Sequence, residues 1–192
     1  AGLRVQIGHS AATYEDACAA LAQGATGFTH LFNAMSALHH RAPGVAGAAL
    51  AHAAQAEIIP DLLHVHPGAI RAALRAIPGL YCVTDSTSAA TMPDGDYTLG
   101  AQRVIKCQGG VRLADGTLAG STLTMDQALR NLVFTLGLPL HEASQRVATY
   151  AAHYLGLADR GQLVAGAWAD VVVLDAALAV QQVWVEGRSG RN

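Results

Sequence analysis

The first 85 residues alternate between short apolar runs and amphipathic stretches. Apolar runs of strand length cover residues 3–8, 25–31, 56–65 and 80–85. Helical patterns cover residues 13–24 and 67–79. The first helix is predicted to start at a Thr13–Asp16 capping box, and the second has proline at its start and glycine at its end. This alternation is typical of parallel βα units and predicts an α/β fold.

Beyond residue 85 the pattern changes. Residues 97–120 carry turn signals at Gly109-Gly110 and at Asp115-Gly116, which predict a hairpin excursion. Amphipathic periods predict helices over residues 122–137 and 140–156. The tail, residues 161–188, contains two short apolar strands with turns between them. We therefore expect a main βα part over residues 1–160 and a small β element over residues 161–192.

Residues 30–44, "HLFNAMSALHHRAPG", concentrate imidazoles and a guanidinium in a chain that has few charges. We expect Pro43-Gly44 to end any helix in this stretch. Such a loop either lies idle on the surface or holds a ligand.

Composition narrows the class of protein. The 192 residues are 52% hydrophobic and 14% charged, with a net charge of -2, which suits one domain with a core. A nearly neutral balance gives no electrostatic basis for binding nucleic acid or an anionic membrane surface. No stretch approaches the roughly 20 apolar residues of a membrane span. The three cysteines, Cys18, Cys82 and Cys107, lack CxxC spacing, so we expect free thiols in the cytoplasm.

Three candidate chemical groups lie at the carboxyl ends of predicted strands. His9 follows "VQIG", His30 follows "TGFT" and Asp85 follows "YCVT". Parallel βα units place their ligands at this end, and imidazole suits zinc and neighbouring metals. The alternative is two ordinary loop histidines and an aspartate that caps the next segment.

A second group combines His64 and His66 with Arg41. An H-x-H pair within a strand faces one side, as metal pairs often do, or it forms a polar edge. Arg41 and His64 would suit a phosphate group, through a charge-assisted fork and a second donor. The alternative for Arg41 is a solvated loop side chain.

Taken together, these segments resemble the N-acetylglucosamine-6-phosphate deacetylase family of the amidohydrolase superfamily. The resemblance runs in order through "GHSAAT" (8–13), "GATGFTHLFNAM" (24–35), "HRAPGVAGAAL" (40–50), "DLLHVHP" (61–67), "VTDS" (83–86), "GTLAGSTLTM" (116–125) and "GQLVAGAWADVVVLD" (161–175). It implies the C-terminal half of a TIM-like (β/α)8 barrel, followed by the C-terminal strands of a small β-sandwich. The implied reaction removes the N-acetyl group of N-acetylglucosamine 6-phosphate and gives glucosamine 6-phosphate and acetate.

The resemblance also implies a role for ten residues. His9 and His30 match metal ligands, and Asp85 matches the catalytic aspartate. Asn33 and Ala34 match the residues that contact the sugar, and Arg41 and His64 match those that contact the phosphate. The loop that lines the pocket matches Leu118, Ala119 and Gly120. Within the homodimer that the family implies, the phosphate pair can reach a site in the neighbouring subunit.

The implied cofactor is a divalent metal, with zinc expected first and iron, manganese or cobalt as alternatives. Such a metal lowers the pKa of bound water from about 16 to about 7. Asp85 would accept a proton from this water and return it to the departing amine.

Two departures from the family pattern qualify this interpretation. His66 stands where many relatives carry an acidic residue, and the family's glutamate metal ligand and substrate-contacting histidine fall upstream of Ala1. A complete (β/α)8 barrel takes about 250 residues. We therefore expect the C-terminal half of a longer enzyme, inactive or poorly folded alone. The alternatives are another amidohydrolase, such as a dihydroorotase-like or adenine-deaminase-like hydrolase, and a truncated domain kept for binding.

Overall fold

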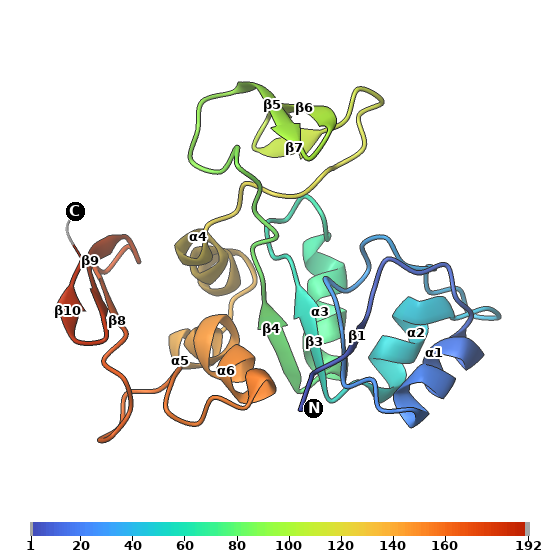
Figure 1. Cartoon of the computed structure of the whole chain (residues 1–192), viewed down its shortest axis with the longest axis horizontal. Coiled ribbons are helices and arrows are strands. Elements are labelled where there is room, and N and C mark those ends of the chain that lie inside the picture. Colours follow the sequence, from blue (N-terminus) through green and yellow to red (C-terminus); the bar gives the residue numbers. More distant parts are fainter. Residues whose placement is uncertain (1, 191–192) are drawn as a thin grey trace.

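The computed structural model describes residues 2–190. Its centre is formed by four short parallel strands: β1 (Gln6–Ile7), β2 (Gly27–Phe28), β3 (Gln55–Ile58) and β4 (Gly79–Cys82). β1 pairs with β2, and β3 pairs with β4. The Leu31 amide donates to the Glu57 carbonyl at 2.8 Å, which joins the two pairs. The strands thus lie side by side in chain order, and within residues 2–190 they close no barrel (Figure 1).

Helices α1 (Tyr14–Ala22), α2 (Gly44–His52) and α3 (Pro67–Ala76) connect these strands. The predicted capping box at the start of α1 is confirmed, because Thr13 and Asp16 exchange hydrogen bonds. Fully buried apolar side chains fill the space between strands and helices, and among them are Phe28, Leu31, Ile58, Ile70 and Leu80. Burial of this one face holds the carboxyl ends of the strands in a fixed order.

Helix α2 corrects the prediction at Pro43-Gly44. The pair begins a helix and does not end one: Pro43 is the N-cap and Gly44 is the first helical residue. Proline suits a helix start because its missing N–H needs no partner there. Gly44 has a φ of +61°, and a Cβ at this position would lie 2.7 Å from the Ser36 carbonyl oxygen. The residues that follow form a helix whose first six residues, 44–49, are buried.

The strand predicted within residues 56–65 is confirmed, but it does not extend to His64. β3 ends at Ile58, and residues 59–66 form a turn. His64 and His66 consequently do not share one face of a strand. The His66 ring instead accepts a hydrogen bond from the Gly68 amide at 3.1 Å and caps α3. A proline at residue 60 and an aspartate that binds backbone amides explain why the strand stops.

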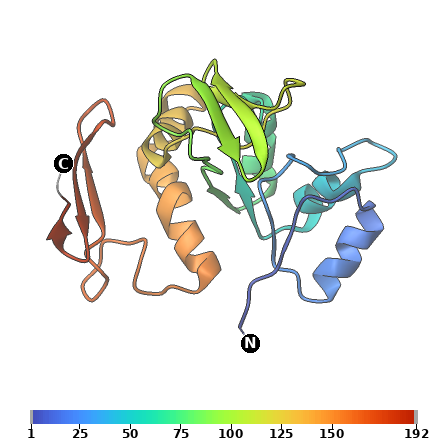
Figure 2. The same ribbon diagram turned by 45° about the horizontal axis from the view of Figure 1, so that its top comes forward.

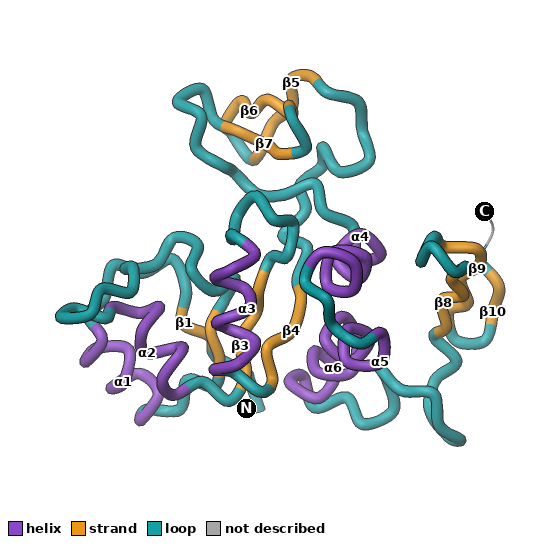
Figure 3. Tube along the Cα trace, turned by 180° about the vertical axis from the view of Figure 1, so that it is seen from behind, coloured by secondary structure: helices purple, strands orange, loops and turns teal. Residues whose placement is uncertain are grey.

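The remaining predicted elements form, with added detail. The excursion is a three-stranded antiparallel sheet of β5 (Gly95–Leu99), β6 (Gln102–Cys107) and β7 (Gly110–Arg112). The two long helices each contain a π-helical turn. They run as α4 (Met125–Arg130) with η1 (Asn131–Thr135), and as α5 (Leu140–Ser144), η2 (Gln145–Thr149) and α6 (Tyr150–Leu155). The second of these helices packs on β4 through η2 and α6, and the first packs against the second (Figure 3).

The tail forms one strand more than predicted. β8 (Val171–Leu174), β9 (Val180–Val185) and β10 (Arg188–Ser189) make an antiparallel sheet at one side of the molecule (Figure 2). Leu178, in the turn between β8 and β9, is buried in the main core. The Arg130 guanidinium donates to the Leu178 carbonyl at 2.9 Å and ties this sheet to α4. All three cysteines are free, as predicted. Within residues 2–190, no helix is long and apolar enough to cross a membrane.

Candidate functional site

The structure brings His9 and His30 together at the carboxyl ends of β1 and β2. Their Nε2 atoms lie 2.9 Å apart, and the rings meet edge to face with centroids 4.8 Å apart. His9 is exposed, whereas His30 is only 7% exposed. The strand-end positions predicted that these two side chains could meet, and the structure brings them together. Two imidazole nitrogens pointing at one place are suited to share a ligand.

Backbone strain marks the same end of the sheet. His9, His30 and Asp85 have φ values of +46°, +27° and +49°. Residues other than glycine seldom adopt this left-handed region, and such strain gathers at functional sites. The three residues singled out for chemistry all share it.

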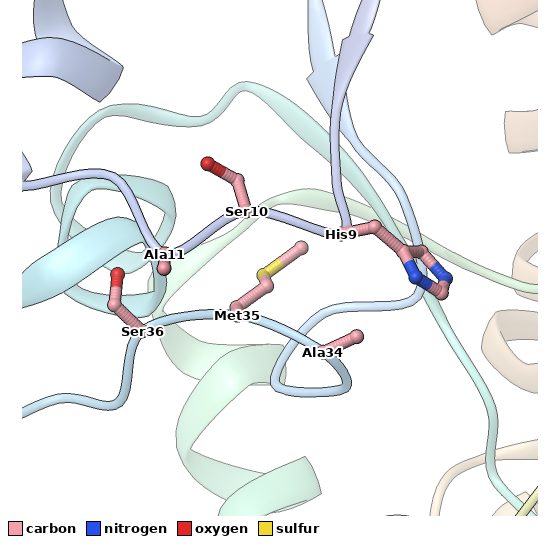
Figure 4. A pocket seen from close by; sticks show the side chains of 6 residues that line it. All are labelled: His9, Ser10, Ala11, Ala34, Met35 and Ser36. Carbon is pink, nitrogen blue, oxygen red and sulfur yellow. The ribbon is translucent and has the colours of Figure 1, made fainter.

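The loop from residue 30 to residue 36 forms one wall beside His9. The Ser10 amide donates to the Ala34 carbonyl at 2.9 Å, and the Ser36 amide donates to the Ser10 carbonyl at 3.0 Å. An open hollow lies here, lined by His9, Ser10, Ala11, Ala34, Met35 and Ser36 (Figure 4). The Asn33 side chain donates to the His30 carbonyl at 3.2 Å. Asn33 and Ala34 thus lie on the loop that flanks the histidine pair.

Asp85 lies beside the loop that contains Leu118, Ala119 and Gly120. The Ser121 amide donates to the Asp85 carbonyl at 2.8 Å, and the Thr87 amide donates to the Ser121 carbonyl at 3.0 Å. A Cβ at Gly120 would lie 2.5 Å from the Thr87 methyl group, so only glycine allows so close an approach. The Asp85 side chain remains exposed. The structure therefore places the predicted pocket loop next to the predicted catalytic aspartate.

The two imidazoles fit two positions of a divalent-metal site. Nitrogens bound to one tetrahedral zinc at about 2.0–2.1 Å stand about 3.4 Å apart, close to the observed separation of 2.9 Å. The other nitrogen of His30, Nδ1, is buried without a hydrogen-bond partner. Metal-binding histidines usually donate this N–H to a second group. Residues 2–190 include no group of three His, Cys, Asp or Glu side chains that could hold a metal.

Arg41 and His64 make their polar contacts in separate loops. The Arg41 guanidinium is exposed and lies 2.8 Å from the His40 ring, in the loop that leads into α2. His64 lies in the turn after β3, where its Nδ1 is 2.6 Å from the Asp61 carboxylate. Figure 1 and Figure 3 show the loop before α2 projecting at the side of the molecule. The structure thus does not join these two side chains directly.

Glu57, which lies behind His30, is not among the residues predicted from the sequence. One Glu57 oxygen accepts the His30 amide at 3.3 Å. The other accepts from the side-chain Nε2 of Gln6 at 3.0 Å and from the Tyr81 hydroxyl at 3.2 Å. Burial, and then the charge of Glu57, raise the pKa of Tyr81 above its usual range. The available signal was a carboxylate between buried Ala56 and Ile58, on the opposite face of the strand from the core.

Known proteins similar to this chain carry names that agree with the geometry of the site. No model of a protein family matches the chain. The chain is 44% identical over 189 residues to the N-acetylgalactosamine-6-phosphate deacetylase of an Escherichia coli strain, covering 97% of this chain and 50% of that protein. Identity to the N-acetylglucosamine-6-phosphate deacetylase of Lysinibacillus sphaericus is 43% over 190 residues, covering 97% and 49%.

A third relative is a short protein of another Escherichia coli strain, provisionally named as an N-acetylgalactosamine-6-phosphate deacetylase. It is 43% identical over 162 residues, which cover 83% of this chain and 97% of that protein. The chain belongs to the N-acetylglucosamine-6-phosphate deacetylase family. It spans about half the length of the first two relatives.

Solved structures of the N-acetylglucosamine-6-phosphate deacetylase family share this fold. The enzyme from Pasteurella multocida superposes with a TM-score of 0.96 at 34% identity, covering 100% of this chain and 51% of that structure. A mutant of the Mycobacterium smegmatis enzyme in complex with N-acetyl-D-glucosamine-6-phosphate gives a TM-score of 0.91 at 39% identity, covering 98% and 51%. The resemblance to the family is thus confirmed in three dimensions.

Proposed function

We propose that this chain supplies the C-terminal half of a site that hydrolyses the N-acetyl group of N-acetylglucosamine 6-phosphate, with glucosamine 6-phosphate and acetate as products. The observation that carries the proposal is the meeting of the His9 and His30 Nε2 atoms at 2.9 Å. A relative named for this activity binds N-acetyl-D-glucosamine-6-phosphate, which supports the choice of substrate.

The proposal includes the larger fold. The four parallel strands would form half of a TIM-like (β/α)8 barrel, and β8–β10 would form part of a small β-sandwich. The strands are in chain order and their carboxyl ends carry the candidate chemistry, as in such barrels. The boundary near residue 160 falls between α6 and β8.

His9 and His30 would hold the divalent cation, with zinc expected before iron, manganese or cobalt. When bound, the cation supplies an activated water and polarises the acyl oxygen. Its remaining protein ligand would come from outside residues 2–190. Asp85 would take a proton from the attacking water and then pass it to the amine nitrogen, since an unprotonated amine leaves poorly. The exposure of the Asp85 carboxylate leaves it free for this transfer.

The remaining residues would position the sugar. Asn33 and Ala34 would contact the sugar ring, and the loop of Leu118, Ala119 and Gly120 would line the pocket beside Asp85. Arg41 and His64 would bind the phosphate. Because Arg41 is exposed and its loop projects from the side of the molecule, it is suited to act in a neighbouring subunit. We propose a homodimer in the cytoplasm on this basis and on the free thiols.

The test is release of acetate from N-acetylglucosamine 6-phosphate with added Zn²⁺. The 192-residue chain is assayed alone and fused behind the N-terminal half of the Lysinibacillus sphaericus relative, of which this chain matches 49%. N-acetylgalactosamine 6-phosphate and unphosphorylated N-acetylglucosamine are assayed in parallel, because relatives carry both sugar names. We expect activity in the fusion alone, highest on N-acetylglucosamine 6-phosphate.

Matched variants assign the activity to this chain. Asp85→Asn in the fusion should lower kcat at least about a thousandfold, since it removes the proton carrier. Asp94→Asn, at another exposed aspartate, should leave kcat unchanged. A folded, metal-loaded fusion that releases no acetate would remove the substrate assignment. Equal activity of the chain alone would instead contradict the half-site argument.

A further inference from the structure

The Asp61 carboxylate and the His64 ring form a closed pair in the turn after β3. Asp61 Oδ2 lies 2.6 Å from His64 Nδ1, and the two side chains are 8% and 7% exposed. The other oxygen, Oδ1, accepts the backbone amides of Leu63 at 2.9 Å and His64 at 2.8 Å. One carboxylate therefore fixes both the backbone on which His64 stands and the direction of its ring.

This contact decides which ring nitrogen is available. Because the carboxylate accepts a hydrogen bond, Nδ1 must carry a proton. His64 Nε2 makes no hydrogen bond within residues 2–190, where the single buried side-chain nitrogen or oxygen without a partner is His30 Nδ1. Nε2 therefore reaches solvent. It is the free position of the ring, and a second proton there would make it a donor to an anion.

Side chains from the helix of α4 and η1 also bind the turn. The Asn131 side chain, at the start of the π-helical turn η1, donates to the Pro60 carbonyl at 2.8 Å. Gln127 in turn donates to Asn131 at 2.8 Å. The π-helical turns that interrupt helices often occur at functional sites. Two independent sets of hydrogen bonds thus fix the segment from Pro60 to His64.

The charge of Asp61 is maintained in this setting. Burial would raise the pKa of Asp61, but hydrogen bonds from the His64 ring and from the turn amides outweigh burial and hold the pKa below its usual value. The aspartate is therefore a carboxylate at neutral pH. A ring that carries a proton on both nitrogens would then face this carboxylate at Nδ1 and a bound phosphate at Nε2.

We propose that Asp61 is a positioning residue that fixes the His64 ring, keeps Nδ1 protonated and presents Nε2 to the phosphate monoester of the substrate. This inference rests on the proposed function, and it assigns Asp61 a share in the preference for phosphorylated over unphosphorylated sugars. Asp61→Asn separates this role from support of the turn. An asparagine can keep its oxygen on the two turn amides, but in place of Oδ2 it presents an NH2 group, which cannot accept the Nδ1 proton.

The first readout is which ring nitrogen of His64 carries the proton. Long-range ¹H–¹⁵N spectra of the ¹⁵N-labelled 192-residue chain at neutral pH measure this. We expect Nδ1 protonated in the wild type and the proton moved to Nε2, or shared, in Asp61→Asn. Asp175→Asn is the matched control, because Asp175 Oδ1 also accepts two turn amides, from Ala177 and Ala179, each at 2.9 Å. It should leave the His64 signals unchanged.

The second readout is KM in the fusion protein described above. Asp61→Asn should raise KM for N-acetylglucosamine 6-phosphate roughly tenfold, the lower end for a hydrogen bond to a charged group. It should leave kcat, and the kcat/KM for unphosphorylated N-acetylglucosamine, unchanged. A loss that is equal for both sugars would mean that Asp61 merely supports the fold, and would overturn the inference.

Failure of the inference is distinct from failure of the proposed function. A wild-type ring protonated at Nε2 alone overturns the inference whatever the substrate. An unchanged KM for the phosphorylated sugar in Asp61→Asn does the same while the deacetylase assignment stands. No acetate release by the wild-type fusion would count against the proposed function, and the ring spectra would then still decide whether Asp61 sets the state of His64.

Discussion

Two histidine sites lie at the carboxyl ends of neighbouring strands, and they differ in how completely their polar atoms are paired. At the first, His9 and His30 contact each other, and the buried Nδ1 of His30 has no partner. At the second, Asp61 satisfies His64 Nδ1 and two backbone amides within four residues of chain. We call the first the open site, because a histidine nitrogen there lacks a partner. We call the second the closed site, because Asp61 satisfies the histidine Nδ1.

The difference separates a site that needs a further group to complete its bonds from a turn whose hydrogen bonds this chain makes by itself. A buried polar atom without a partner costs about 1–3 kcal/mol, so His30 gains when another group accepts the Nδ1 hydrogen. The two facing Nε2 atoms can in addition share a bound metal ion. The Asp61–His64 turn gains nothing of this kind, because its bonds are already made. We therefore expect the first site to respond to metal and the second to be set by folding.

The largest effect is expected at the open site. His30→Ala should weaken Zn²⁺ binding by about a hundredfold or more, because one of two imidazole ligands is lost. Isothermal titration of the chain with Zn²⁺ measures this change. His153→Ala, at an exposed histidine on α6, is the control and should bind like the wild type. Equal binding by all three proteins would mean that the histidine pair does not hold the metal.

The closed site should matter more for stability. Asp61→Ala removes the acceptor for the His64 ring and for two turn amides, so we expect unfolding to require about 2–3 kcal/mol less free energy. Urea unfolding monitored by circular dichroism gives the value. Asp175→Ala, in an exposed turn with a similar pair of amide contacts, should cost about 1 kcal/mol or less. A smaller loss at Asp61 than at Asp175 would contradict the comparison.

The closed site should also contribute a pH dependence. The pKa of Asp61 is lower in the folded chain than its ordinary value of 3.8, because hydrogen bonds to the carboxylate outweigh burial. The unfolded state then binds more protons between the two pKa values, so stability rises with pH there. The contribution is full above the unfolded pKa and is lost as pH falls through the folded one. Urea unfolding from pH 6 to pH 3 should show a shallower decline for Asp61→Asn than for the wild type.

The smallest effect is expected away from both sites. Gln108 and Gly109 join β6 to β7 with φ values of +51° and +75°, the signs of a type I′ turn. Asparagine tolerates this conformation better than glutamine, so Gln108→Asn should stabilise the chain by about 0.5 kcal/mol. Zn²⁺ binding and the His64 spectra should not change. A change in either would show that the β5–β7 sheet is coupled to the histidine sites.

The sequence predicted the order of the elements and much of the candidate site. The strand-end positions of His9 and His30 predicted that the two rings could meet, and they do. The order of segments predicted the fold of the family. Errors arose where one signal had two meanings. Pro43-Gly44 can end a helix or begin one, and the apolar run before His64 can continue as a strand or turn at an aspartate. Local pattern does not separate these cases, because the outcome depends on which neighbours satisfy the backbone.

The sequence by itself determined the βα alternation, the Thr13 cap, the free cysteines and the strand-end positions of His9, His30 and Asp85, since these follow from local periodicity and residue type. Only the tertiary structure decided that Asp61 holds His64, that Glu57 lies behind His30 and that Asp85 adjoins the loop at Gly120. Those contacts join strand ends, turns and loops whose separation in space is set by the packing of the helices on the strands. Burial of one apolar face fixes that packing, and the polar contacts follow from it.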